Sequence, residues 1–371
     1  MIEVIDTGLI YRGDESAAHF RNTYWPTVVE LNNGDLLASM DISNIMNSRD
    51  ARSYYSISQD QGKNWSDPKI IWDGNGFPYP FHTTCRISRT PDGQVIGFMA
   101  IKDRSNSDQP HTNPENGGMI NMEQAVVRWN NDSQSWLKPE IFKRPIEWKC
   151  YESCHAIFPV TSETWLLPTA FRTNWDGECP WGHKAFAFVT RDCGKSWNEI
   201  VDVFDCSSEN LICWEQKQTF LSDGRLLAVC WIFNDEKKVN QNNRYTFSTN
   251  LGDSYGDIFE CPIYGQTCTP IGLPDNHILG VYRRLDKNGL WGHLAKIEGN
   301  KWIPISEELI WGKDVEAVKG VKDDHSIQNQ KTLQFGFPTM IQLRDGYIFL
   351  VFWCVEDGLS NIRWYRLKSE V

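Results

Sequence analysis

One octet pattern occurs twice in this sequence and constrains its fold more than any other feature. Ser/Thr-x-Asp-x-Gly-x-x-Trp spans residues 58–65 and 190–197, and a relaxed copy at residues 248–255 has Asn250 for Asp and Tyr255 for Trp. The Asp or Asn side chain can accept backbone N–H groups inside a tight turn, and Gly supplies a positive φ. Each octet therefore predicts a hairpin turn with its aromatic ring packed beneath, and its recurrence predicts a fold built from repeats.

A longer unit, an extended run followed by a Gly- or Asp-rich turn and an apolar strand, recurs six times. The copies begin at Pro26, Cys85, His155, Gln216, Cys268 and Pro338. Their spacing of roughly 50–70 residues matches four strands with their loops, which is one blade of a β-propeller. The octets fall in the first, third and fourth copies, and the second and fifth copies end at Trp136 and Trp302.

The sequence thus predicts an all-β chain that forms a single six-bladed β-propeller domain over residues 1–371, with blades of four antiparallel strands. The sixth copy lacks an outer hairpin motif, so we expect the N-terminal residues 3–10 to pair with it and close the ring. Polar insertions at residues 102–119, 173–182, 234–243 and 312–330 are expected to be loops on a propeller face.

The octets are Asp-boxes, and on them the chain resembles the sialidase-like (BNR repeat) β-propellers. The resemblance implies that the octets are structural and lie on the face away from the active site. They therefore identify the fold and not the substrate.

Composition narrows the partners. A net charge of −11 argues against a nucleic acid or an anionic membrane, which a basic patch would bind. The N-terminus has no apolar signal-peptide core, and the 11 cysteines are scattered through expected strands such as those with Cys213, Cys230 and Cys354. We expect reduced thiols in a cytoplasmic protein. Cys150, Cys154 and His155 lack a second Cys/His pair, so no metal or other cofactor is expected.

In the sialidase fold the innermost strands begin on one face around the axis. Aligning the six turns places six triplets there, and their middle residues are Trp25, Thr84, Cys154, Glu215, Thr267 and Phe337. Ionisable groups that converge on an axis are costly to bury unless they are paired or used. The candidate catalytic residues are Asp50, Glu152, His155 and Glu215, and the candidate substrate-binding residues are Tyr24, Trp25, Arg49, Arg86, Arg172, Gln266 and Arg283.

The resemblance also implies where the family's catalytic residues would fall. Tyr24 stands in place of the arginine that holds a sialic-acid carboxylate, and Phe337 stands in place of the nucleophilic tyrosine. Glu215 keeps the place of the glutamate that activates that tyrosine, and Asp50 lies within one residue of the expected acid/base aspartate. Because phenylalanine cannot be a nucleophile, ordinary retaining sialidase activity is not expected.

Each candidate also has a structural alternative. Glu215 could be salt-bridged to Lys217, and Glu152 with His155 could cap a strand. Arg172 and Arg283 could join neighbouring blades, and Trp25 could pack between them.

Three functions remain open. The leading one is an exo-acting glycoside hydrolase on oligosaccharides that pairs Asp50 with Glu215 or Glu152. A carboxyl separation of about 5 Å would predict retention, and about 6.5–9.5 Å would predict inversion. The second is a uronic-acid lyase, with His155 or Tyr24 as base and an arginine on the substrate carboxylate. The third is a non-catalytic propeller that binds a glycan or a protein.

Overall fold

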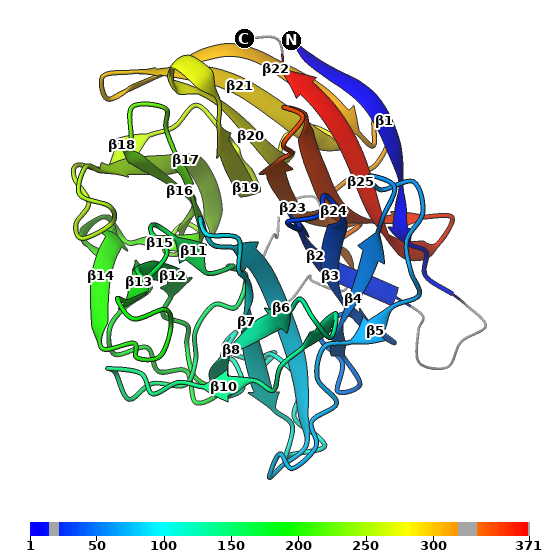
Figure 1. The fold of residues 1–371 in the computed structure, drawn as a ribbon. Helices are drawn as coiled ribbons and strands as arrows, with labels where there is room; N and C mark the ends of the chain where they lie inside the picture. Colours follow the sequence, from blue (N-terminus) through cyan, green and yellow to red (C-terminus); the bar gives the residue numbers. More distant parts are fainter. Residues whose placement is uncertain (15–21, 318–331, 370–371) are drawn as a thin grey trace.

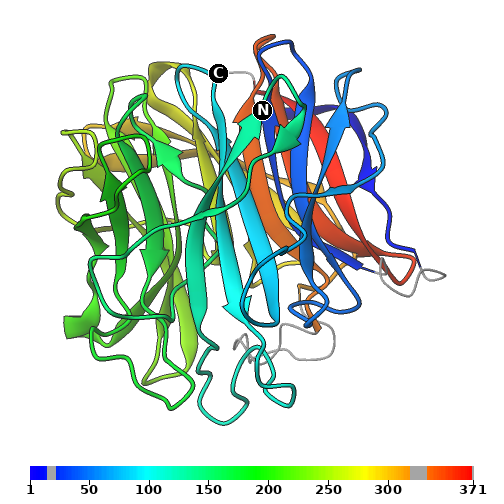
Figure 2. The same ribbon diagram turned by 60° about the horizontal axis from the view of Figure 1, so that its bottom comes forward.

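The computed structural model describes residues 1–14, 22–317 and 332–369. They form six antiparallel sheets in a ring around a central axis, and the chain runs through the sheets in order (Figure 1). Figure 2 shows the same ring tilted, with neighbouring blades side by side. The prediction of an all-β, six-bladed β-propeller is confirmed.

Within each blade the strands follow one another from the axis outward. Blade 1 is β2 (Asn22–Glu30), β3 (Leu36–Ser43), β4 (Arg52–Ser58) and β5 (Lys69–Ile70). Blade 2 is β6 (Phe81–Arg89), β7 (Val95–Asp103), β8 (Met122–Asn130) and β10 (Glu140–Ile141), with β9 (Ser135–Trp136) also paired to β8. Blade 3 is β11 (Phe158–Pro159), β12 (Trp165–Ala170), β13 (Ala185–Thr190) and β14 (Glu199–Phe204).

Blade 4 is β15 (Leu211–Phe220), β16 (Leu226–Asn234), β17 (Val239–Ser248) and β18 (Phe259–Glu260). Blade 5 is β19 (Gly265–Gly272), β20 (His277–Arg284), β21 (Leu290–Glu298) and β22 (Lys301–Trp311). Blade 6 is β23 (Phe335–Gln342), β24 (Ile348–Glu356), β25 (Leu359–Ser369) and β1 (Ile2–Tyr11). Two short 3₁₀ helices, η1 (Ser207–Glu209) and η2 (Pro274–Asn276), lie in connections.

The N-terminal strand closes the ring as predicted. β1 pairs antiparallel with β25, from Ile2 opposite Ser369 to Tyr11 opposite Ile362. The first residues of the chain thus supply the outer strand of the last blade, and this pairing covers an edge that would otherwise be open.

Apolar side chains fill the spaces between neighbouring blades. The cluster between blades 2 and 3 contains Phe98 and Trp165, and the cluster that joins blade 6 to blade 1 contains Phe349 and Leu36. Innermost strands are also stitched by threonines: Thr27 Oγ1 accepts the Ile87 N–H across the blade 1–2 boundary at 2.9 Å. Each blade is therefore stabilised by its two neighbours.

The three octets fold into the same turn. In the second octet the Thr190 hydroxyl accepts the Gly194 N–H at 3.0 Å, and Asp192 Oδ1 accepts the Ser196 N–H at 2.9 Å. The first octet repeats both bonds at 2.8 Å, and the relaxed third copy repeats them at 2.8 and 3.0 Å. Asn250 therefore substitutes for Asp as an acceptor.

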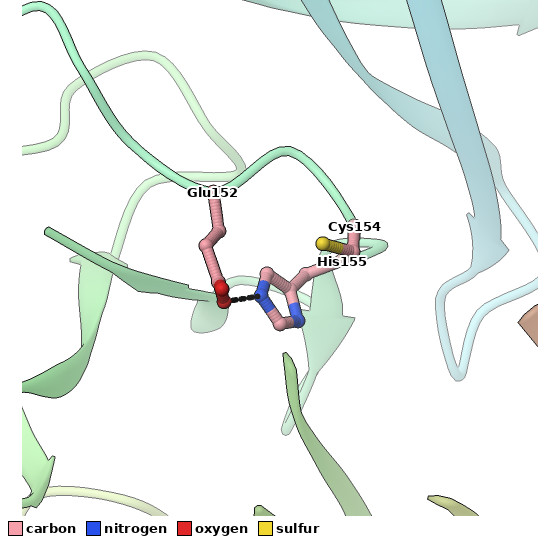
Figure 3. Close-up of side chains that lie close together, drawn as sticks. All are labelled: Glu152, Cys154 and His155. Carbon is pink, nitrogen blue, oxygen red and sulfur yellow. Dashed lines mark hydrogen bonds and ion pairs between the residues drawn. The ribbon is translucent and has the colours of Figure 1, made fainter. Parts of the chain in front are cut away.

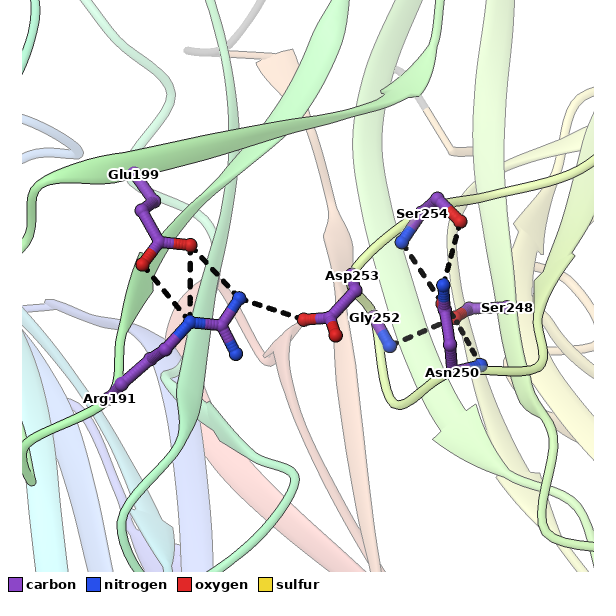
Figure 4. A network of polar contacts seen from close by, with 7 residues as sticks. All are labelled: Arg191, Glu199, Ser248, Asn250, Gly252, Asp253 and Ser254. Atoms are coloured by element: carbon purple, nitrogen blue, oxygen red, sulfur yellow. Dashed lines mark hydrogen bonds and ion pairs between the residues drawn. The ribbon is translucent and has the colours of Figure 1, made fainter.

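The turns of blades 3 and 4 are joined at the surface. Arg191 donates to Glu199 on its own hairpin and to Asp253 of the next octet at 2.8 Å (Figure 4). Both partners are about half exposed, so the bridge contributes little stability and serves mainly to align the two hairpins.

Two local expectations differ from the structure. Residues 234–243 were expected to be a loop, but β16 extends to Asn234 and pairs with Val239, the first residue of β17, so this segment is a hairpin. The third repeat was expected to begin a full inner strand at His155, yet β11 contains only Phe158 and Pro159. Residues 318–330 of the last predicted insertion lie outside the described residues. No helix within the described ranges is long and apolar enough to span a membrane.

Candidate active site

The middle residue of each of the six triplets lines one pocket on the propeller axis. These residues are Trp25, Thr84, Cys154, Glu215, Thr267 and Phe337, one from each blade. The pocket has a cavity volume of about 120 Å³. All six blades therefore contribute to one pocket, and concave sites of this kind are where ligands commonly bind.

Four of these residues have a left-handed backbone. The φ angles are 57° at Trp25, 51° at Glu215, 55° at Thr267 and 53° at Phe337, and each coincides with a shift of register between the innermost strand and its neighbour. This conformation costs a non-glycine residue about 1–3 kcal/mol, and such bulges re-aim a side chain. Strain at the same point of four blades, always facing the pocket, makes this pocket the candidate functional site.

Two carboxylates line this pocket. Glu152 is 5% exposed, and its Oε2 accepts the Glu215 N–H at 2.9 Å and lies 3.2 Å from His155 Nε2. Its Oε1 lies 3.5 Å from Arg172 Nη1. The Glu215 side chain is approached by the Cys154 thiol, 3.7 Å from Oε1, while Oε2 has no hydrogen-bond partner among the described residues.

These environments move the two pKa values apart. Burial raises the pKa of Glu215, the nearby Glu152 charge adds to the rise, and Lys217 and Arg283 only partly oppose it. Burial would also raise the pKa of Glu152, but the His155 hydrogen bond and the Arg172 charge outweigh it and lower that pKa overall. These shifts favour the protonated form of Glu215 and the ionised form of Glu152.

Four cationic side chains outnumber these two carboxylates in the pocket lining: Arg86, Lys102, Arg172 and Arg283. Arg283 is committed to protein contacts, because Nε donates to Gln266 Oε1 at 3.1 Å and Nη1 donates to the Phe335 carbonyl at 2.7 Å. Arg86 is 2% exposed, and its Nε lacks a partner among the described residues. The excess of positive charge suits an anionic ligand.

Lys102 and His111 form a second polar pair in the lining. Lys102 Nζ lies 3.0 Å from His111 Nε2, and the Lys102 side chain is almost fully buried. Burial lowers the pKa of Lys102 to about 7, with Asp41 acting in the opposite direction and Arg86 adding to the fall. Burial and the Lys102 charge also hold the pKa of His111 well below its ordinary value.

Seven of the residues predicted from the sequence line this pocket: Trp25, Arg86, Glu152, Arg172, Glu215, Gln266 and Arg283. His155 is not part of this lining. It lines a second cavity of about 700 Å³ that runs along the innermost strands, which we call the axial channel. Tyr24 is 8% exposed and packs edge-on against Trp353 in the core between blades 6 and 1.

Asp50 and Arg49 belong to the loop between β3 and β4 and are not part of the pocket lining. Asp50 accepts the Asn44 N–H at 2.9 Å and a bond from the Ser48 hydroxyl, so it holds its own loop together. Arg49 donates to the Arg104 carbonyl at 2.9 Å. Neither contact tests a catalytic or binding role, and both roles stay predictions.

Sequence reasoning missed several lining residues, among them His111 and Trp231, whereas Trp214 stood beside Glu215 in one of the six aligned triplets. His111 comes from the long connection after β7, and no sequence pattern indicates where that connection folds. Trp214 and Trp231 are directly paired on β15 and β16, with ring centroids 4.6 Å apart. The clustering of Trp at the start of one strand and the end of the next was the available signal.

No protein-family model and no curated protein sequence matches this chain. Solved structures do. A Dyadobacter fermentans protein of unknown function aligns with 100% of this chain and 99% of its own at a TM-score of 0.74 and 16% identity. The NanB sialidase of Streptococcus pneumoniae aligns over 97% of this chain and 70% of its own, with a TM-score of 0.62 and 12% identity.

An α-L-arabinanase of Penicillium chrysogenum, solved with arabinobiose, aligns over 98% of both chains at a TM-score of 0.61 and 13% identity. Identities of 12–16% carry the fold and not the activity. On its six blades and on these likenesses, the chain has the sialidase-like six-bladed β-propeller fold.

Proposed function

We propose that this chain is an exo-acting glycoside hydrolase that releases a sugar from the end of an acidic oligosaccharide. The observation that carries the proposal is the pair Glu152 and Glu215. Both carboxylates line one pocket, and their surroundings favour ionisation of the first and protonation of the second. Acid-catalysed glycoside cleavage requires such a pair.

In the proposed reaction Glu215 donates its proton to the glycosidic oxygen. The bond between that oxygen and the anomeric carbon breaks, and its electron pair leaves with the oxygen. Water then adds to the anomeric carbon and gives its proton to Glu152. Phe337 stands where the resemblance would place a nucleophilic tyrosine, so attack by water is the simpler route.

The substrate class follows from charge and shape. Four cations and two carboxylates give the lining an excess of positive charge, which favours a sugar that bears a carboxylate. Trp25, which is only partly buried, supplies an aromatic face for the sugar ring. A pocket closed by six blades accepts a chain end more readily than a chain interior. Solved neighbours that are sialidases and an arabinanase support carbohydrate as the ligand.

The test is mass spectrometry of the protein incubated with sialylated, uronic-acid-containing and neutral oligosaccharides. We expect one acidic member to give two products whose masses sum to the substrate plus one water. Glu215→Gln should lower the rate by roughly 10²–10⁴, the usual contribution of a general acid. Glu147→Gln, the same change at an exposed position, should leave the rate unchanged. Full turnover by Glu215→Gln would refute the acid role, and saturable glycan binding without any product would favour the non-catalytic alternative.

A lyase is the second candidate, because one observation favours it. A lysine whose pKa is lowered to about 7 is partly neutral at neutral pH and can abstract the proton next to a carboxylate. Arg86 beside it would neutralise that carboxylate. An unsaturated, ultraviolet-absorbing product without added water, lost in Lys102→Met, would identify this reaction in place of hydrolysis.

A further inference from the structure

Three chemically different side chains converge at the start of blade 3. Glu152, Cys154 and His155 each offer one donor atom, and these atoms all lie within 4.8 Å of one another (Figure 3). Glu152 and His155 are 5% and 1% exposed, and Cys154 is half-buried. Exposed acidic clusters are common without a metal, whereas this cluster is largely buried and mixes oxygen, sulfur and nitrogen.

The backbone at this point departs from the pattern of the other blades. β11 is only two residues long, and residues 152–157 cross the region without strand pairing. This irregular segment allows residues 152, 154 and 155 to face one another, which strict alternation in a strand would prevent for the last two. The blade with the shortest inner strand is thus the one that gathers the three donors.

Neighbouring groups hold the cluster in place. The Glu215 N–H donates to Glu152 Oε2 at 2.9 Å, and Arg172 lies 3.5 Å from the other oxygen, Oε1. Lys217 donates to the Cys154 carbonyl and fixes that backbone. Orientation of ligands by such outer contacts is typical of metal sites.

The spacing and charge fit one divalent ion of the zinc type. Tetrahedral zinc separates two N/O donors by about 3.3 Å and a sulfur from either by about 3.6 Å, from bond lengths near 2.0–2.1 and 2.3 Å. His155 Nε2 and Glu152 Oε2 already lie 3.2 Å apart, and because the three donor atoms span up to 4.8 Å, the Cys154 sulfur would move closer to bind the same ion. A carboxylate and a thiolate formed on binding would bring two negative charges to a divalent ion, and Arg172, 3.5 Å from Glu152 Oε1, offsets part of them.

A fourth position is present on the pocket side. Glu215 Oε1 is 3.7 Å from the Cys154 sulfur, and Oε2 of the same carboxylate is buried without a hydrogen-bond partner among the described residues. Cys154, Glu152 and Glu215 all line the pocket, so this position is reached from the axis. Either Glu215 or a small ligand could occupy this fourth coordination position of the metal.

We propose that Glu152, Cys154 and His155 form a binding site for a zinc-type divalent transition metal that opens onto the axial pocket. Sulfur and imidazole donors favour such ions over Mg²⁺ and Ca²⁺, which prefer all-oxygen sites. The acid–base roles proposed above belong to the metal-free protein, because a bound ion takes the Glu152 oxygen that they use. Binding requires no sugar, so its test is independent of the proposed hydrolysis.

The experiment is a Co²⁺ and Zn²⁺ titration of the full chain. Co²⁺ should produce a sulfur-to-metal charge-transfer absorption that saturates at one equivalent and is abolished by excess Zn²⁺. Cys154→Ser should remove this absorption and weaken Zn²⁺ binding at least about tenfold. Loss of a group that only supports a metal ligand already lowers affinity by about that factor, and loss of the ligand itself should lower it at least as much. Cys193→Ser is the matched control, since this half-buried thiol lies in the blade 3 octet and should leave both signals unchanged.

A second readout needs no variant and covers the case in which Cys154→Ser does not fold. In the wild-type chain, Zn²⁺ should slow alkylation of Cys154 by iodoacetamide, followed by peptide mass spectrometry, and leave Cys193 unaffected. The proposal is overturned if no charge-transfer absorption forms, if Cys154→Ser binds as tightly as the wild type, or if Zn²⁺ fails to protect Cys154. Equal protection of Cys154 and Cys193 would also overturn it, because it would indicate binding without a site.

Discussion

Lys102 is a buried cation whose removal should make the protein more stable. Its pKa falls from 10.5 to about 7, mainly because burial disfavours the charged amine. At about 1.36 kcal/mol per pKa unit, that shift corresponds to roughly 5 kcal/mol of unfavourable free energy while both states are protonated. Lys102→Met removes the charge but also the hydrogen bond to His111, which is worth about 1–3 kcal/mol. We expect a net gain of about 2–4 kcal/mol at pH 6–7.

The pH dependence provides the decisive signature. Below pH 7 the folded and unfolded chains both carry the Lys102 proton, so the full penalty is present. Between about pH 7 and pH 10.4 the unfolded chain binds one more proton, and wild-type stability should gain up to about 1.36 kcal/mol per pH unit from this group. The advantage of Lys102→Met should therefore shrink steadily as the pH rises.

Urea denaturation of wild type and variant at pH 6, 7, 8 and 9 measures this difference. Lys195→Met, the same change at an exposed position, should show neither the gain nor the pH dependence. A difference between wild type and Lys102→Met that stays constant over this range would falsify the burial argument, even if the variant proved more stable.

Three further changes test the packing and the ion pairs. Glu152→Gln leaves Arg172 without its buried partner and should cost about 3–5 kcal/mol at pH 7 in urea denaturation. Because the folded pKa of Glu152 is lowered, this cost should shrink as the pH falls from the ordinary glutamate range through the lower folded pKa. Gly252→Ala should destabilise more than Gly224→Ala, since both have φ near +90° but only the first would place its Cβ 2.5 Å from another side chain; equal losses of melting temperature would contradict this reading. Trp197→Ala should cost about 3–5 kcal/mol because the indole is fully buried, and a loss below 1 kcal/mol would show that the octet aromatic does not anchor its hairpin.

The fold could be predicted because its decisive signals are local. An octet turn needs only its own hydroxyl, carboxylate and glycine, and the structure shows those contacts within five residues, as between Thr190 and Gly194. Six copies of one turn then fix the number of blades. The sixth repeat lacks an outer hairpin motif, so the pairing of the N-terminal strand β1 with the last blade could also be predicted.

The segment at residues 234–243 was mispredicted because its polarity was taken to indicate a loop. β16 and β17 remain paired there by backbone bonds, and Asn240 accepts the Trp231 indole N–H at 2.7 Å. A hairpin that extends beyond the core needs ladder pairing and one such contact but no apolar alternation. Composition alone cannot distinguish it from a loop.

The only part of the site that could be predicted was the part that follows from aligning the repeats with one another. Alignment of the six turns was enough to place one residue of each blade at the axis, because the repeats share one geometry. It did not indicate that four of them adopt a left-handed backbone, which depends on bulges between strands. Nor did it indicate His111, which reaches Lys102 from a connection whose path depends on tertiary contacts.

Phe337 shows how a residue that cannot react still shapes the chemistry. Its ring lies 4.8 Å from the Arg86 guanidinium and 4.5 Å from the Lys217 ammonium, so it holds two cations by cation–π contact. It lines both the axial pocket and the channel beyond it and therefore forms part of the wall between them. A hydroxyl at this position would be the nucleophile that the resemblance implies. With a phenyl ring here, the ionisable groups of the described lining that the proposed reactions can draw on are the carboxylates, Lys102, His111 and Cys154. The reactions that we propose therefore draw on the inner ends of blades 2, 3 and 4 and not on blade 6.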